Sequence, residues 1–149
     1  MADISGADGD TVKLLKECDS GIKMGIASIE DVIDDVKNNE FRTLLHDCKT
    51  EHEKLGNEIF DLLNEHNDDG KDPTPMAKGM SWIKTNMKMA VDDSDNTVAD
   101  LITDGCNMGV KSLSRYLNQY KSADHKSRDI TSRLVKIEDN LATDIRQFL

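Results

Sequence analysis

Proline, glycine and aromatic residues are scarce in this chain. Its 149 residues include two prolines and nine glycines, and only 4% are aromatic. A sandwich or barrel of many short strands requires frequent glycine and proline turns between alternating β-branched and aromatic runs. Because the sequence has neither feature, it predicts an all-α fold, and its length predicts a single compact domain.

Basic residues and long apolar runs are also lacking. The 19 Lys and Arg residues are outnumbered by 29 Asp and Glu residues, which gives a formal net charge of -10. No nucleic-acid partner is therefore expected, because phosphate backbones attract basic surfaces. No run of about 18 apolar residues occurs, so no membrane span is expected. The N-terminal residues lack the basic flank and apolar stretch of a signal peptide, and we expect a cytoplasmic protein.

The cysteines are few and dispersed. Cys18, Cys48 and Cys106 form an odd number and lie far apart in the sequence. A disulfide framework needs paired cysteines and an oxidising compartment. We therefore expect three buried thiols that act as small apolar residues.

Four segments carry apolar residues at the three- and four-residue spacing of amphipathic helices. The predicted helices cover about 11–37, 40–66, 96–120 and 123–148. We expect Asp10 or Thr11 to cap the first helix, Asn38 with Asn39 to start the second, and Ser122 to cap the fourth. Short turns then join the helices into hairpins at 10–66 and 96–149, preceded by a flexible polar tail at 1–9. Residues 10–149 are predicted to form one four-helix-bundle domain.

The hairpins are joined by a long crossover, residues 67–95. Thr74-Pro75 is a favourable helix start, so a short helix is predicted from there to about Val91. About 16 helical residues at 1.5 Å each span roughly 24 Å, most of the length of a bundle. The second and third long helices can therefore run parallel, as in bundles with one long crossover.

The two hairpins resemble each other. Gly21-Ile22-Lys23-Met24-Gly25 recurs as Gly105-Cys106-Asn107-Met108-Gly109, an offset of 84 residues. The second helices align at an offset of 86, which places His52 on Glu138. This pattern indicates a duplicated helical hairpin.

The repeated glycines need a physical reason, because each costs about 1 kcal/mol relative to alanine inside a helix. Gly21, Gly25, Gly105 and Gly109 form a small-residue face at matching heights. Two explanations remain open. The face packs the first and third helices closely within one chain, or it forms the seam of a homodimer.

Several short motifs resemble a known superfamily. The stretch Cys18–Gly25, the later Trp82 after Gly79, and Asp104-Gly105 resemble a group of small bacterial ferritin-like bundles of unknown function. The paired hairpins and long crossover are also similar to the ferritin-like superfamily. The resemblance implies a ferritin-like four-helix bundle. In the superfamily's iron-binding members each half supplies a glutamate and a Glu-x-x-His pair.

This chain departs from that iron-binding pattern. No Glu-x-x-His occurs, and the middle of the first helix carries Ile22, Ile26 and Ile29 where a ligand carboxylate is expected. The resemblance therefore implies the fold without a di-iron site, because a scaffold does not fix the site built on it. We expect no enzymatic activity.

Four residues are nevertheless predicted to meet in the middle of the bundle. Residues equally distant from a hairpin turn lie at one height, which brings together His52, Glu138, Cys48 and Cys106. Imidazole, thiolate and carboxylate are competent ligands for a divalent transition metal. The same positions also suit a buried histidine hydrogen-bonded to a glutamate beside two apolar thiols.

The sequence thus favours a non-catalytic structural, stress-associated or protein-interaction module without a cofactor, acting as a homodimer or with an unidentified protein partner. The alternative is a metal-binding protein with a non-standard site made by the four mid-bundle residues. A third hypothesis uses the methionine-bearing crossover as a movable cover over a hydrophobic cleft for an apolar ligand.

Overall fold

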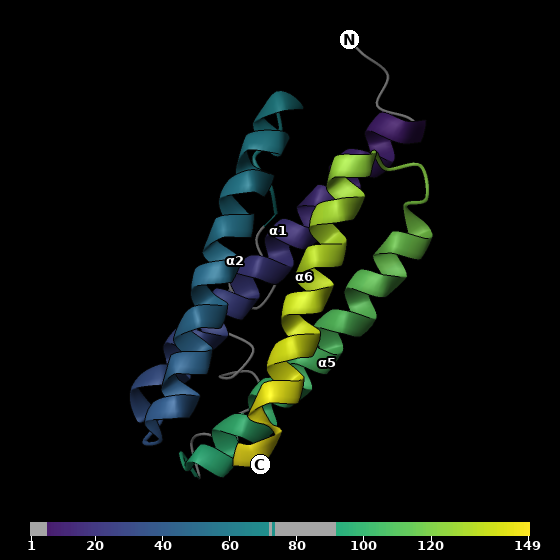
Figure 1. Cartoon of the computed structure of the whole chain (residues 1–149). Helices are drawn as coiled ribbons and strands as arrows, with labels where there is room; N and C mark the ends of the chain where they lie inside the picture. Colours follow the sequence, from purple (N-terminus) through teal and green to yellow (C-terminus); the bar gives the residue numbers. More distant parts are fainter. Residues whose placement is uncertain (1–5, 72, 74–91) are drawn as a thin grey trace.

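The long helices of the bundle dominate the computed structural model, which describes residues 6–71, 73 and 92–149 (Figure 1). Regular structure in these ranges is entirely helical, which confirms the all-α prediction. The elements are α1 (Gly6–Val32), the 3-10 turn η1 (Ile33–Asp35), α2 (Asn39–Glu65), α5 (Asp95–Gln119), α6 (His125–Asp144) and the 3-10 turn η3 (Ile145–Phe148). None of the helices described is both long and apolar enough to cross a bilayer.

The two hairpin turns lie at opposite ends of the bundle. The turn between α1 and α2 contacts the start of α5, where the Lys37 and Asn38 amides donate to the Asp95 carboxylate at 2.8 and 2.9 Å. The turn between α5 and α6 contacts the start of α1 instead (Figure 1). Therefore α2 and α5 run parallel, as predicted, and the chain between them has to travel the length of the bundle. The predicted short helix at 74–91 lies outside the described residues.

The predicted start of the first helix is wrong. Helix α1 begins at Gly6, so residues 6–9 belong to the helix and not to a tail, while residues 1–5 lie outside the described part. Asp10 and Thr11 do not cap α1. Their side chains instead accept from the Ser122 and Asp124 amides at 2.9 and 2.8 Å, so they hold the opposite turn.

The other caps follow the local chemistry of each turn. Asn38 caps α2 as predicted, because its side chain accepts from the Phe41 amide. Helix α6 is capped by Asp124, which accepts from the Ser127 amide, and not by Ser122. Both residues are good caps by type, but α6 begins at His125, so Asp124 and not Ser122 occupies the cap position.

Contacts at the turns repeat between the hairpins at the offsets found in the sequence. Arg42 donates to the Val36 carbonyl, and Arg128, at the equivalent place, donates to the Tyr120 carbonyl at 3.2 Å. The capping residues Asn38 and Asp124 are equivalent in the same way. The repeat in sequence is therefore also a repeat in side-chain contacts, which supports the duplicated hairpin.

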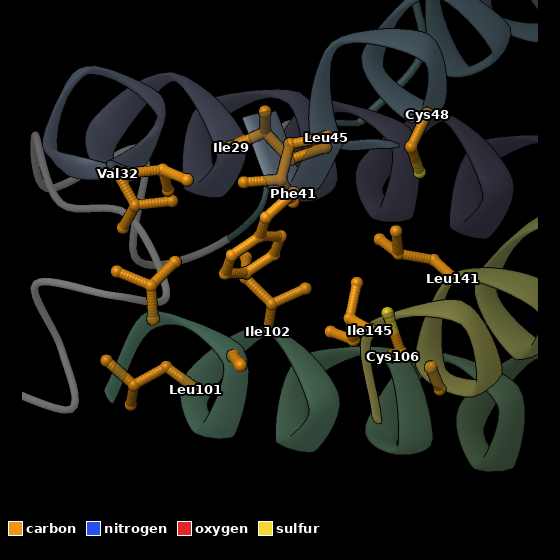
Figure 2. Packing of buried hydrophobic residues seen from close by; sticks show 14 residues of the cluster. Ile29, Val32, Phe41, Leu45, Cys48, Leu101, Ile102, Cys106, Leu141 and Ile145 are labelled. Carbon is orange, nitrogen blue, oxygen red and sulfur yellow. The ribbon is translucent and has the colours of Figure 1, made fainter. Parts of the chain in front are cut away.

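The apolar core is divided into two clusters along the bundle. One fills the end near the α1–α2 turn, where Phe41 projects into the middle and Cys48, Cys106 and Leu141 lie together at its inner edge (Figure 2). The other fills the opposite end and includes Cys18, which is hydrogen-bonded to Thr131 at 3.1 Å. Cys18 is thus in a different cluster from Cys48 and Cys106.

Candidate ligand pocket

A polar layer separates the two apolar clusters, and each long helix contributes one residue to it. These residues are Gly25, His52, Gly109 and Glu138. A methyl group built on Gly25 would lie 2.9 Å from His52 Nε2, and one on Gly109 would lie 3.5 Å from the Glu138 carboxylate. Gly25 therefore leaves room for the His52 ring, which explains glycine at this position inside the helix despite its cost, whereas a methyl group on Gly109 would make only an ordinary van der Waals contact.

The imidazole of His52 is held at both nitrogens. Nε2 lies 2.7 Å from Glu138 Oε1, and Nδ1 lies 2.8 Å from the Cys48 carbonyl. A carbonyl and a carboxylate only accept hydrogen bonds, so both ring nitrogens donate and the ring carries a positive charge. Burial opposes that charge, but the hydrogen bonds to Cys48 and Glu138 and the charge of Glu138 outweigh it. The pKa of His52 is therefore raised above 6.5.

The two nearby cysteines are protonated thiols. Burial raises the pKa of Cys48 and Cys106, and the Glu138 carboxylate raises that of Cys106 further. Cys48 Sγ lies 3.5 Å from His52 Nδ1, and Cys106 lies near enough to Glu138 for the carboxylate to affect its pKa. A thiol with a raised pKa is a poor nucleophile and a poor metal ligand at neutral pH, because both tasks need the thiolate.

The structure brings together the four residues expected to meet in the middle of the bundle. They form a chain of contacts from Cys48 through His52 and Glu138 to Cys106. Within the described ranges, no group of three or more His, Cys, Asp or Glu residues is arranged to hold a metal ion. Both nitrogens of His52 are already used in hydrogen bonds, so the imidazole has no lone pair for a metal. A di-iron group like that of the superfamily's iron-binding members does not fit these residues, in agreement with the missing Glu-x-x-His pattern.

A pocket of about 340 Å³ lies between α1 and α5, with His52 and Glu138 at its base. Most of its surface is apolar, and the remainder consists of a few polar groups. The volume falls in the range of small-molecule sites, and it holds on the order of ten non-hydrogen atoms at about 30 Å³ each. Small residues shape it, because Gly21, Gly25, Gly105 and Gly109 all contribute to the lining.

The four glycines of the predicted small-residue face therefore have different roles in packing and in lining the pocket. Gly25 makes room for His52 of α2, and Gly109 lies beside Glu138 of α6 at a distance that a methyl group would also allow. Gly21 borders open space, since no described atom lies within 4 Å of a methyl group built on it. Gly105 lines the pocket. Glycine at 21 thus keeps the pocket open.

One end of the pocket carries polar residues that sequence reasoning missed. Glu17 lies on α1, and its carboxylate accepts from Lys71 Nζ at 2.6 Å; Tyr116 of α5 lies close by, and burial together with the Glu17 carboxylate raises the pKa of its hydroxyl. The Lys71 amide is also fixed, because it donates to Asp19 Oδ2 at 2.9 Å. The contacts of Lys71 with Asp19 and Glu17 join residues 52 and 54 positions apart, so no periodicity connects them. Only the packing of the segment after α2 against α1 brings them together.

The raised pKa of His52 predicts a pH-dependent stability. The charged His52 is stabilised in the folded protein, because its pKa is higher there than in the unfolded chain. This adds to the free energy of unfolding in full below about pH 6.5, the unfolded pKa, and the added stability is lost as pH rises toward the folded pKa. From pH 7 to pH 8 the free energy of unfolding should fall by about 1 kcal/mol more in the wild type than in His52→Leu/Glu138→Leu. Urea unfolding at both pH values measures this difference. Equal falls in the two proteins would mean that the folded imidazole is neutral.

Comparison with known proteins gives no relative from which a function can be taken: no protein-family model, curated protein or solved structure matches this chain. The geometry of the pocket is therefore the basis for assigning a function.

Proposed function

We propose that this protein is a non-catalytic binding module with a ferritin-like helix arrangement, and that it binds a small, mostly apolar molecule in the pocket between α1 and α5. The pocket carries the proposal: about 340 Å³ of mostly apolar space beside a fixed polar pair. Such a combination of apolar walls and a few oriented polar groups is typical of small-molecule sites.

The chemistry of the pocket supports binding rather than catalysis. A general base needs a free lone pair, and both nitrogens of His52 donate hydrogen bonds. A cysteine nucleophile needs a lowered pKa, and burial raises the pKa of Cys48 and Cys106. The ferritin-like arrangement is supported by the parallel course of α2 and α5 and by the repeated turn contacts.

Naphthalene, an uncharged molecule of ten carbon atoms, is a suitable first probe. At a free concentration ten times its Kd it should stabilise the protein by about 1.4 kcal/mol. For a chain of this size that raises the Tm by about 3 to 6 °C. Thermal unfolding with and without naphthalene, and titration calorimetry, measure the effect.

A matched pair of glycine variants locates the binding. Gly21→Leu extends into the open space at the pocket, so it should remove the naphthalene shift while the protein stays folded. Gly56→Ala on α2 is the control, because its methyl group meets Ile22 at 3.4 Å, away from the pocket, and the naphthalene shift should remain. Binding that survives Gly21→Leu, or no binding to the wild type, would contradict the proposal.

Metal analysis of untagged protein tests the alternative function in the same samples. The proposal expects no stoichiometric zinc, iron or manganese and no change of Tm with a chelator. One equivalent of metal that is lost in His52→Ala would favour the metal-binding function instead.

A further inference from the structure

The pocket is polar at one end and apolar at the other. Helices α1 and α5 run antiparallel, so Glu17 is level with Tyr116 and Ile29 is level with Ile102. Glu17, Ser20 and Tyr116 border the first end, and Ile29, Leu101 and Ile102 border the second. Glu17 and Ile29 are twelve residues apart on α1, which is about 18 Å along the helix. The pocket therefore suits an elongated molecule with two unlike ends.

The charge at the polar end is balanced. The Glu17 carboxylate is paired with the Lys71 ammonium at 2.6 Å. Among the described residues that line the pocket there is no Lys or Arg, and Glu17 and Glu138 are its only acidic residues. At this end an anionic head would meet the Glu17 carboxylate in a chain of net charge -10, and a cationic head would have to replace Lys71.

We propose that the ligand is a medium-chain amphiphile with an uncharged hydroxyl head. Its chain lies along the pocket toward Ile29, Leu101 and Ile102, and its hydroxyl donates to the Glu17 carboxylate beside Tyr116. This inference rests on the proposed function, because it names the class of ligand for the same pocket. A hydroxyl satisfies Glu17 without adding a charge, and the alkyl chain covers the apolar end.

Three probes with the same chain and different heads test the inference by titration calorimetry on the full chain. They are 1-decanol, decanoate and decylammonium, each used below its solubility or micelle limit. We expect 1-decanol to bind at least tenfold more tightly than either ion. One hydrogen bond to a charged group accounts for a factor of this size.

The variant Glu17→Leu distinguishes the contribution of the head group to binding from that of the alkyl chain. This variant should weaken 1-decanol binding by about tenfold and leave naphthalene binding unchanged, because naphthalene has no head group. Tighter binding of decanoate or decylammonium, or equal binding of all three probes, would overturn the hydroxyl head and leave the proposed function standing. If neither naphthalene nor any decyl probe binds, both the inference and the proposed function fail.

Discussion

Replacing His52 by leucine is expected to lower the free energy of unfolding by about 3 kcal/mol or more. The imidazole is 1% exposed and is paired at 2.7 Å with Glu138, so its loss leaves a carboxylate in the core without its partner. Breaking a buried ion pair on one side typically costs about 3 to 5 kcal/mol. The Glu138 side chain is 13% exposed, which places the expected loss at the lower end. A Tm lower by on the order of 10 °C follows for a chain of this size.

The double variant His52→Leu/Glu138→Leu distinguishes a lost pair from lost packing. When both charged partners are replaced by apolar side chains of similar volume, no buried charge is left, and most of the stability should return. Urea unfolding of the wild type, His52→Leu and the double variant measures both effects. A double variant no more stable than His52→Leu would show that packing, and not an unpaired Glu138, causes the loss.

The second large effect is expected at the glycines of the polar layer. Gly25→Ala places a methyl group 2.9 Å from His52 Nε2 and 3.0 Å from its Cδ2, closer than real contacts allow. The imidazole cannot move away from the methyl group without breaking its hydrogen bond to Glu138 or to the Cys48 carbonyl. Overpacking of this kind costs about 1 to 3 kcal/mol, against a gain of about 1 kcal/mol in helix propensity.

Gly109→Ala is the matched control, since it occupies the equivalent place in the other hairpin. Its methyl group would lie 3.5 Å from the Glu138 carboxylate, an ordinary van der Waals distance. This variant should therefore keep the propensity gain and be as stable as the wild type or more stable. We expect the two alanine variants to differ by about 1 to 3 kcal/mol in urea unfolding, because both gain the same helix propensity and only Gly25→Ala is overpacked. Equal stability would mean that His52 moves freely.

The sequence predicts the helices and the contacts in the middle of the bundle well. Both depend on the spacing of apolar residues and on the number of residues between a position and its turn. Apolar periodicity locates the helices, and the length of the crossover predicts that α2 and α5 run parallel. Counting residues from each turn brings His52 and Glu138 to one height, and they are in contact. The start of α1 was not predictable in this way, because Asp10 and Thr11 are good caps whose side chains are used by a turn 112 and 113 residues away.

The pocket could not be predicted from the sequence alone. Its existence depends on how far apart α1 and α5 lie, and its polar end depends on Lys71 reaching Glu17 from 54 residues away. The glycine face was visible as a repeat, but the sequence left two uses open. Only the structure shows that Gly25 faces His52 while Gly21 borders open space.

The contact between His52 and Glu138 has a consequence for a hairpin that pairs with a second copy of itself. In such a dimer the positions equivalent to His52 and Glu138 would carry the same amino acid, so two imidazoles or two carboxylates would face each other. Like charges at this separation repel, so one of the two would have to stay neutral. Joining both hairpins in one chain removes that restriction, since each place can carry its own residue. A single chain with two hairpins can therefore place a carboxylate opposite an imidazole at its centre, and a dimer of identical hairpins cannot.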